Sequence, residues 1–161
     1  YADRVDLFLT SGGVSVGKKD IMHGVVPALG AERLFWRVCM KPGAPAIAYT
    51  RGRMLGIALS GNPFAAYATF ELMARPAIAR LAGETDVLMS RRRAVLADAF
   101  PKPCHGRRFL RARMEADGRV SLPDQHASGS LFSAAGCDAF VDVPAGTPPL
   151  AAGTAVDVVI L

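Results

Sequence analysis

The hydrophobic pattern changes character near residues 83–87, and this change constrains the fold more than any other feature. Before it, short apolar runs alternate with segments of helical spacing; after it, short strand-like runs alternate with Gly and Pro. Alternating strands and helices are typical of an α/β layer, whereas strands alone are typical of a sandwich or barrel. The sequence therefore predicts an α/β region at residues 1–84 and a small all-β domain at residues 85–161.

In the first half, apolar runs predict four strands, the first of them buried. They are Asp6–Thr10, Leu34–Met40, Ala46–Tyr49 and Met54–Leu59. Helical spacing predicts a helix at Asp20–Leu29, short or kinked because it contains Gly24 and Pro27, and a long helix at Phe64–Leu81. We expect Asn62 to cap the long helix and Pro63 to occupy its first position.

The second half shows only short strand-like runs between Pro and Gly residues. The predicted strands are Ala94–Ala97, Phe109–Met114, Arg119–Leu122, Ala139–Val143 and Ala155–Leu161. The Asp-Gly pair at residues 117–118 predicts a hairpin turn between the second and third of these strands. This pattern favours a barrel-like domain.

Composition excludes several classes of protein. Of the 161 residues, 51% are hydrophobic, which is enough for a core, and no run reaches the roughly 18 apolar residues of a membrane span. The three cysteines are too few and too scattered for a disulfide framework, and the three histidines show no metal-ligand spacing. The net charge of +5 comes with 7% aromatic residues, which argues against a nucleic-acid platform, so the run Arg91–Arg93 is interpreted as a solvated face.

The first candidate site is the glycine-rich segment between the first strand and the first helix. Gly12, Gly13, Ser15 and Gly17 could bring backbone N–H groups close to a phosphate, and Asp20 follows as either a metal ligand or a helix-start residue. A nucleotide-binding P-loop needs Ser or Thr after its lysine, and Lys19 stands there instead. A tight turn without a ligand remains the alternative.

Two further groups lie in the same α/β region. The loop Ser60–Pro63 precedes the long helix and could bind an anion or be no more than a helix start. Arg37 and Lys41, with Pro42 and Gly43 in the following turn, are cations near a strand end that could equally be solvated. Three strand exits, one acid and two cations within about 50 residues have the composition of a metal-assisted phosphate or oxyanion site.

The second half offers a weaker oxyanion site. Arg107 and Arg108 precede one predicted strand, and Ser128 and Ser130 follow the predicted hairpin. Arginines and hydroxyls could close over an oxyanion. The alternative is an exposed rim of the barrel.

At these residues the sequence resembles the MoeA family, which includes the E domain of gephyrin. The resemblance rests on Ser11–Gly17 with Asp20, on Phe35–Gly43, on Leu59–Pro63 and on the tail from Arg107 to Gly153, in that order. It implies that residues 1–84 are the second half of a three-layer MogA-like molybdopterin-binding domain and that residues 85–161 are the family's C-terminal β domain. The missing first half and Tyr1 in place of a methionine lead us to expect a piece of a longer enzyme, inactive alone.

The resemblance also implies the chemistry. Such an enzyme inserts molybdate into adenylylated molybdopterin with Mg²⁺ and releases AMP. Asp20, Arg37 and Lys41 match catalytic positions, with Asp20 as metal ligand, while Arg107 or Arg108 and Ser128 match the molybdate side. The molybdopterin-binding positions are matched by the glycine-rich loop, by Pro42 and Gly43, and by Ser60, Gly61, Asn62 and Pro63. A homodimer, a MogA-like adenylyltransferase partner, a cytoplasmic location and no membrane or nucleic-acid partner are expected.

Three residues depart from the family pattern. Ala44 replaces the usual second lysine of the turn, Ser60 replaces a proline, and Ala65 replaces a common serine. These losses remove a cation and a hydroxyl from the expected molybdate neighbourhood. A non-catalytic molybdopterin-binding or scaffold protein is therefore the second hypothesis, and a P-loop nucleotide-binding protein the third.

Overall fold

The computed structural model describes residues 4–17, 20–124 and 129–161 and divides into two compact units. Unit 1 comprises the chain up to Val38 together with Gly43–Val87, and unit 2 comprises Cys39–Pro42 and Leu88–Leu161. The predicted α/β class followed by a β-barrel is confirmed. The domain assignment 1–84 and 85–161 stays a prediction, because a compact unit of a structure is not by itself a folding domain.

Unit 1 is built on a four-stranded mixed sheet. In spatial order its strands are β1 (Leu7–Ser11), β5 (Met54–Leu59), β4 (Ile47–Arg51) and β2 (Glu32–Trp36). β1 is parallel to β5, and β4 is antiparallel to both β5 and β2. Hence β1, β5 and β2 run in the same direction, and the loops that follow these three strands leave the sheet at one edge.

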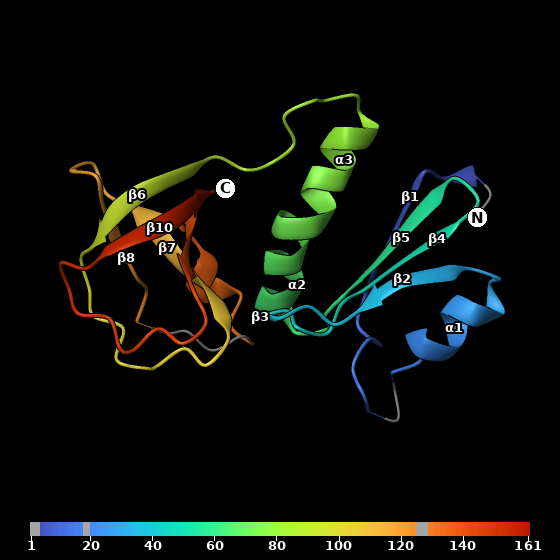
Figure 1. Cartoon of the computed structure of the whole chain (residues 1–161), viewed down its shortest axis with the longest axis horizontal. Helices are drawn as coiled ribbons and strands as arrows, with labels where there is room; N and C mark the ends of the chain where they lie inside the picture. The colour runs from blue at the N-terminus through green and yellow to red at the C-terminus, as the bar shows by residue number, and fades with distance from the viewer. Residues whose placement is uncertain (1–3, 18–19, 125–128) are drawn as a thin grey trace. The chain divides into compact units, whose positions relative to one another are not determined.

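Helices cover both faces of this sheet (Figure 1). Helix α1 (Met22–Ala28) packs on one face, where its buried Met22 and Val26 join Tyr49 and Val14 in one apolar cluster. The other face carries α2 (Pro63–Thr69), the π-helical turn η2 (Phe70–Ala74) and α3 (Arg75–Leu81), of which Ala74 packs on Ile57 and Leu59. Unit 1 therefore has three layers.

The long helix confirms its prediction in extent but not in form. It runs from Pro63 to Leu81, yet a π-helical turn interrupts it at Phe70–Ala74. Pro76 follows that turn and has no N–H to continue an α-helical ladder. The cap prediction was half right, since Asn62 holds the N-cap position with an extended backbone but makes no side-chain capping bond.

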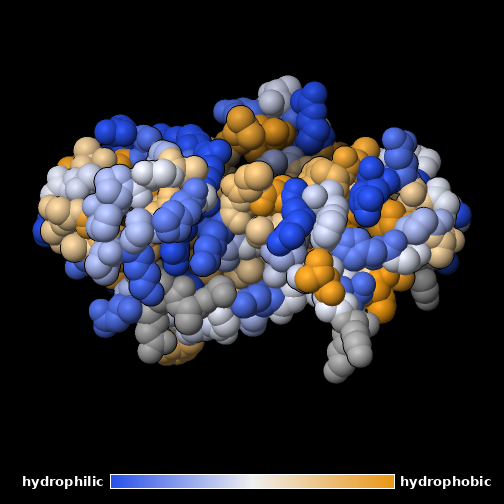
Figure 2. Space-filling model, turned by 60° about the horizontal axis from the view of Figure 1, so that its bottom comes forward, coloured by the Kyte–Doolittle hydropathy of each residue, from blue (hydrophilic) through white to orange (hydrophobic). Residues whose placement is uncertain are grey.

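Two strand predictions in unit 1 were wrong in detail. The first strand was expected to be buried, but β1 lies at the sheet edge with Phe8 37% and Leu9 36% exposed. The strand expected at Leu34–Met40 ends at Trp36, because Arg37 takes a left-handed backbone with φ 69°. Apolar patches over unit 1 are visible in Figure 2, consistent with its exposed large apolar side chains.

Unit 2 is a closed five-stranded barrel. Its strands are β6 (Arg91–Leu96), β7 (Arg107–Met114), β8 (Arg119–Ser121), β9 (Ala139–Val143) and β10 (Ala155–Ile160). They pair in the order β7-β8-β6-β10-β9, and β9 returns to pair with β7. The interior is filled by apolar side chains of all five strands, among them Leu96, Leu110, Val120, Val141 and Val158.

Two further elements complete unit 2. The two-residue strand β3 (Met40–Lys41) adds to the barrel parallel to β7, and a 3₁₀ turn, η3, spans Phe132–Ala134. The predicted hairpin is confirmed: β7 and β8 are antiparallel, and Gly118 has φ 82° in the turn between them. The structure thus places Lys41, expected in a turn of the first half, within the sheet of unit 2.

Candidate functional site

Two of the predicted loops lie against each other in unit 1. The Gly12 N–H donates to the carbonyl of Leu59 at 3.0 Å, and the Ser11 hydroxyl donates to the carbonyl of Ser60 at 3.2 Å. A Cβ on Gly61 would lie 3.1 Å from the Cα of Gly12, so the two backbones approach as closely as glycine permits. The glycine-rich segment and the Ser60–Pro63 loop therefore form one continuous backbone surface at the edge of the sheet.

The segment Gly12–Gly17, hereafter the glycine loop, is fastened to its own unit by three acceptor carbonyls. The carbonyl of Gly13 accepts the Met22 N–H, that of Val14 accepts the indole N–H of Trp36, and that of Ser15 lies 2.9 Å from Nε2 of His23. Sequence reasoning missed Trp36 and His23. An aromatic residue at the end of a strand and a histidine in a helix give no signal by themselves, and only the fold brings them to this loop.

Asp20 has a role that neither sequence alternative named. Its carboxylate accepts the Gly17 N–H at 2.5 Å, and its own N–H donates to the carbonyl of Gly17. The N-cap of α1 is Ile21, without a side-chain capping bond, so Asp20 closes the glycine loop instead of starting the helix. One carboxylate oxygen remains outside this bond, which makes Asp20 at most a single metal ligand.

The described residues do not form a complete metal site. Within residues 4–17, 20–124 and 129–161, no three His, Cys, Asp or Glu side chains come together. Mg²⁺ prefers octahedral oxygen ligands, and unit 1 offers it one carboxylate at this edge, already shared with a backbone N–H. One carboxylate suits an Mg²⁺ ion that is held mainly by substrate phosphates, and it does not suit a resident ion held by the protein alone.

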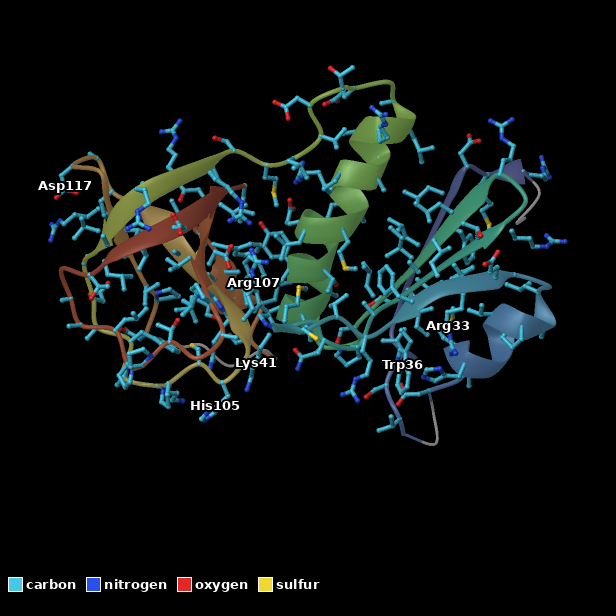
Figure 3. All side chains as sticks on the ribbon, in the orientation of Figure 1. Arg33, Trp36, Lys41, His105, Arg107 and Asp117 are labelled. Carbon is cyan, nitrogen blue, oxygen red and sulfur yellow. The ribbon has the colours of Figure 1, made fainter. Side chains whose placement is uncertain are left out.

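The two cations expected to act together belong to different units. Arg37 lies just beyond β2 in unit 1, where its guanidinium carbon is 5.5 Å from the centre of the Trp36 ring. Lys41 lies in β3 of unit 2, in register with Arg108 of β7. Pro42 and Gly43 follow, with a cis peptide before Pro42 and φ 94° at Gly43. Lys41 and Trp36 are labelled in Figure 3.

The structure gives different partners to Arg107 and Arg108. The sequence left open which of the two matches the molybdate-binding position. Arg107 forms a two-pronged ion pair with Asp142 of β9, its Nε and terminal nitrogen lying 2.8 and 2.6 Å from the two carboxylate oxygens. Arg91 adds a second ion pair to the same carboxylate at 2.8 Å. We call Asp142, Arg107 and Arg91 the arginine cluster.

The arginine cluster holds its buried acid ionised. Burial alone would raise the pKa of Asp142, but hydrogen bonds and charge from Arg107 and Arg91 outweigh it and bring the pKa below the ordinary value of 3.8. The same contact with Asp142 raises the pKa of Arg107. Both hydrogen bonds of this pair go from Arg107 to a carboxylate of the protein itself.

Arg108 has an aromatic ring as its neighbour. Its guanidinium carbon lies 5.0 Å from the centre of the Phe100 ring, and its side chain lines a depression of about 480 Å³ together with Lys102, Asp98 and Asp124. In the described part of the chain Arg108 makes no ion pair. Of the two arginines, Arg108 is therefore the one whose charge is available to an anion.

The hydroxyl side of the expected oxyanion site is only partly described. Ser128 lies outside the described residues. The neighbouring segment is anchored by Arg111, which is 1% exposed and donates to the carbonyl of Ser130 at 2.6 Å and to the hydroxyl of Ser133. Burial lowers the pKa of Arg111. Sequence reasoning missed this anchor because an arginine within a strand is usually an exposed residue.

Comparison with known families divides the chain in two. Residues 1–80 match the family described as a probable molybdopterin binding domain, and residues 93–161 match the C-terminal region, domain IV, of MoeA. The first match covers the glycine loop, Asp20, Arg37, Lys41 and the Ser60–Pro63 loop. The second covers Arg107, Arg108 and Asp142.

Curated relatives match over nearly the whole chain. A molybdopterin molybdenumtransferase of Bacillus subtilis (strain 168) is 37% identical over 162 residues, covering 98% of this chain and 37% of its own length. One of Staphylococcus aureus (strain Mu50) is 33% identical over 162 residues, covering 98% of this chain and 38% of its own length. The chain thus spans little more than a third of these relatives.

Solved structures agree on the fold. The MoeA protein of molybdopterin biosynthesis from Pyrococcus horikoshii superposes with a TM-score of 0.80 at 24% identity, covering 98% of this chain and 38% of its own. A molybdenum cofactor biosynthesis protein from Pyrococcus furiosus gives a TM-score of 0.72 at 26% identity, covering 99% of this chain and 51% of its own. Among the described residues, no helix has the length and apolar character needed to cross a bilayer.

Proposed function

Because the chain belongs to the MoeA family, we propose that it carries part of a molybdopterin molybdenumtransferase. The whole protein would take adenylylated molybdopterin, release AMP in the presence of Mg²⁺ and insert molybdate into the dithiolene of the pterin. Covering little more than a third of its relatives, this chain would supply part of the pterin-binding surface and the barrel, and would be inactive alone.

The observation that carries the proposal is the meeting of three strand exits in unit 1. β1, β5 and β2 end at one edge, and there the glycine loop and the Ser60–Pro63 loop touch at Gly12 and Gly61. Ligands of open α/β sheets bind beyond the carboxyl ends of strands, and backbone N–H groups of glycine-rich loops suit phosphates. The phosphate-bearing part of the pterin is assigned to this edge.

The catalytic roles expected of Asp20, Arg37 and Lys41 stay part of the proposal. Asp20 would act first by closing the glycine loop through Gly17, and its second oxygen would be left for a metal carried by the substrate phosphates. Arg37 would offer its charge beside Trp36 at the same edge. Lys41 would act from unit 2, next in register to Arg108.

We assign the molybdate-facing arginine to Arg108 instead of Arg107. Arg107 is neutralised by Asp142, whereas Arg108 makes no ion pair among the described residues and lines an open depression. Ser128 keeps its expected role as hydroxyl donor to molybdate. Reversal or removal of the charge at Arg108 should therefore reduce the affinity for molybdate more than the same substitution at Arg107.

The experiment is reconstitution with the full-length protein that contains this chain. Adenylylated molybdopterin, magnesium and molybdate are supplied, and AMP release and active cofactor are measured. The proposal predicts both products, with loss of AMP release in Asp20→Asn and loss of molybdate dependence in Arg108→Ala. Hydrolysis of added ATP that needs no molybdopterin would contradict it and favour a nucleotide-binding protein.

The second candidate is a molybdopterin-binding protein without catalysis. It is favoured by Ala44 and Ala65, which lack the usual cation and hydroxyl, and by the single carboxylate at the loop edge. Ser60 is less telling, because its hydroxyl accepts the Asn62 N–H and so has a place in the loop. Binding of molybdopterin without AMP release would support this candidate, and a gain in molybdate affinity in Ala44→Lys would show what was lost.

The remaining partners belong to the same proposal. A homodimer of the whole protein and a MogA-like adenylyltransferase that hands over the adenylylated pterin are expected from the family. A cytoplasmic location agrees with the three free thiols of Cys39, Cys104 and Cys137. Light scattering of the full-length protein and co-purification with the adenylyltransferase would test the two associations.

A further inference from the structure

The peptide groups of the glycine loop have a fixed orientation. Two consecutive carbonyls, those of Val14 and Ser15, point at side chains of the same unit: the first accepts the Trp36 indole N–H at 3.0 Å, and the second lies 2.9 Å from His23 Nε2. Trp36 comes from the end of β2 and His23 from α1. Both donors thus hold the loop from the side of the folded unit.

The opposite face of the same peptides follows from covalent geometry. A trans peptide is planar, with its N–H directed against its C=O, and no cis peptide is found in the described part of this loop. With both carbonyls turned toward Trp36 and His23, the N–H groups of Ser15 and Val16 point away from these side chains. Ser15 is half-buried and Val16 is 76% exposed.

These two N–H groups are left for a ligand. In the part of the chain that the structure describes, neither donates a hydrogen bond to a protein acceptor. The next N–H along, that of Gly17, is taken by the carboxylate of Asp20. Two adjacent N–H groups directed the same way are the arrangement that binds an oxyanion in backbone nests.

We propose that Trp36 and His23 are positioning residues that set these two peptide planes, and so present the Ser15 and Val16 N–H groups to the phosphate of the pterin substrate. The inference rests on the proposed function for the identity of the ligand. It adds to that function the two side chains on which phosphate recognition depends. Figure 3 shows Trp36 at the end of β2, close to the loop that follows β1.

The contacts between the two positioning residues support this role. Their rings meet edge to face at 4.6 Å with an interplanar angle of 83°, so each restrains the rotamer of the other. Folding of the loop does not depend on them alone, since Val14 is 1% exposed and packs in the apolar cluster with Tyr49. Loss of their hydrogen bonds should therefore change the orientation of the peptides more than the stability of the unit.

The first test uses inorganic phosphate as the probe and the 161-residue chain. Amide resonances of Ser15 and Val16 are followed by NMR as phosphate is added. Trp36→Phe and His23→Phe keep a ring at each position and remove the N–H donor, whereas His23→Gln keeps a donor of similar reach. Leu34→Ala is the matched control, because Leu34 lies on the same strand as Trp36 and its side chain is 54% exposed.

The expected result is saturable shifts of both amides in the native chain, in His23→Gln and in Leu34→Ala. The two Phe variants should need about tenfold more phosphate, the usual effect of losing part of a hydrogen bond to a charged group, with unfolding midpoints within a few degrees of native. Shifts that are absent in the native chain, or equal in all variants, would overturn the proposal. Phosphate binding that is kept in His23→Gln but weakened in His23→Phe shows that the hydrogen bond, and not the packing of the ring, positions the peptide.

The second test compares the binding of molybdopterin and of its dephosphorylated form to the full-length protein that contains this chain. In the Phe variants, affinity for molybdopterin should fall about tenfold while affinity for the dephosphorylated pterin stays unchanged. An equal loss for both ligands would overturn the positioning role. If the native chain shows the phosphate-induced shifts but the full-length protein that contains it binds neither pterin, the positioning role stands and the proposed function fails.

Discussion

The two units hold their candidate site residues by different means. In unit 1 the groups aimed at a ligand are backbone N–H groups, fixed by the uncharged contacts of Trp36, by His23 and by the close approach of Gly12 to Gly61. In unit 2 the group aimed at a ligand is the side chain of Arg108 on a barrel strand, and its neighbour Arg107 is held by the buried carboxylate of Asp142. The contacts of Trp36 and of Gly12 therefore depend on shape, whereas the contact of Arg107 depends on charge.

This difference decides how each unit responds to solution conditions. Packing and backbone hydrogen bonds between neutral groups change little with pH or salt, whereas ion pairs lose strength when a partner is protonated or screened. A perturbation of the apolar packing in unit 1 should thus cost the same free energy across pH, and a perturbation of the arginine cluster should not.

The largest effect is expected from Gly56→Ala in unit 1. Gly56 lies opposite Tyr49 in the sheet, and a Cβ there would be 2.1 Å from the buried Tyr49 ring. The ring would have to leave a cluster that also holds Val14 of the glycine loop, at a cost of about 3 kcal/mol of unfolding free energy. Denaturant unfolding measures it.

The matched control is Gly24→Ala in α1, where no atom lies within 4 Å of the added Cβ. There the change should stabilise the chain by about 0.5–1 kcal/mol through helix propensity. The two effects should be the same at pH 4 and pH 7. If the loss of unfolding free energy in Gly56→Ala differed strongly between pH 4 and pH 7, the packing of Gly56 against Tyr49 would not depend on shape alone.

The second largest effect is expected from Asp142→Asn in unit 2. The variant keeps the side-chain size but leaves Arg91 and Arg107 without their shared acid, at a cost of about 2 kcal/mol near neutral pH, less than for a fully buried pair because both arginines are half exposed. Because folding lowers the pKa of Asp142, its contribution is present above the ordinary value of 3.8 and is lost as the pH falls through the lowered pKa.

Unfolding curves of native and variant chains between pH 3 and pH 7 would measure this dependence. The gap between the two free energies should be constant at the upper end and should narrow below about pH 4. A gap that stays constant down to pH 3 would mean that the carboxylate contributes through its shape and not through its charge. The arginine cluster would then respond to pH no more than the apolar packing of unit 1 does.

Much of the fold could be predicted from the sequence because it rests on local signals. The apolar run Met54–Leu59 and the strand Ala139–Val143 were predicted with the bounds that the structure has. Helical spacing gave the extent of Pro63–Leu81 to within one residue, and Asp-Gly gave the turn at Gly118. Each of these signals is complete within a few residues of the chain.

What the sequence could not predict depends on partners far along the chain. Arg107 and Asp142 are 35 residues apart, and nothing near Arg107 tells that its charge is taken. Trp36 reaches Val14 across 22 residues, and β3 joins a barrel whose other strands begin 50 residues later. The resemblance to a family named the candidate residues, but only the fold shows which of them share an edge.

A smaller effect distinguishes two arginines of the same strand. Arg91 pairs with Asp142, which is 6% exposed, whereas Arg93 pairs with Asp157, which is 51% exposed. Arg91→Ala should cost about 1 kcal/mol and Arg93→Ala less than about 0.5 kcal/mol, because an exposed ion pair is weakened by solvent. Thermal unfolding of the two variants at low and high salt measures the difference, and equal costs would show that burial of the acid is not what matters.

The smallest effect is expected from Tyr49→Phe, and it has the opposite sign. The Tyr49 side chain is fully buried, and in the described part of the chain its hydroxyl has no hydrogen-bond partner. Burial also raises the pKa of this phenol, in line with an environment that disfavours charge. Removing an unsatisfied hydroxyl while keeping the ring should stabilise the chain by up to about 1 kcal/mol, since a buried polar group without a partner carries a desolvation cost.

The gain in stability of Tyr49→Phe should be independent of salt and of pH between 4 and 7, because it comes from packing. A loss of stability would reveal a partner for the hydroxyl, and with it a polar contribution to the core beneath the glycine loop.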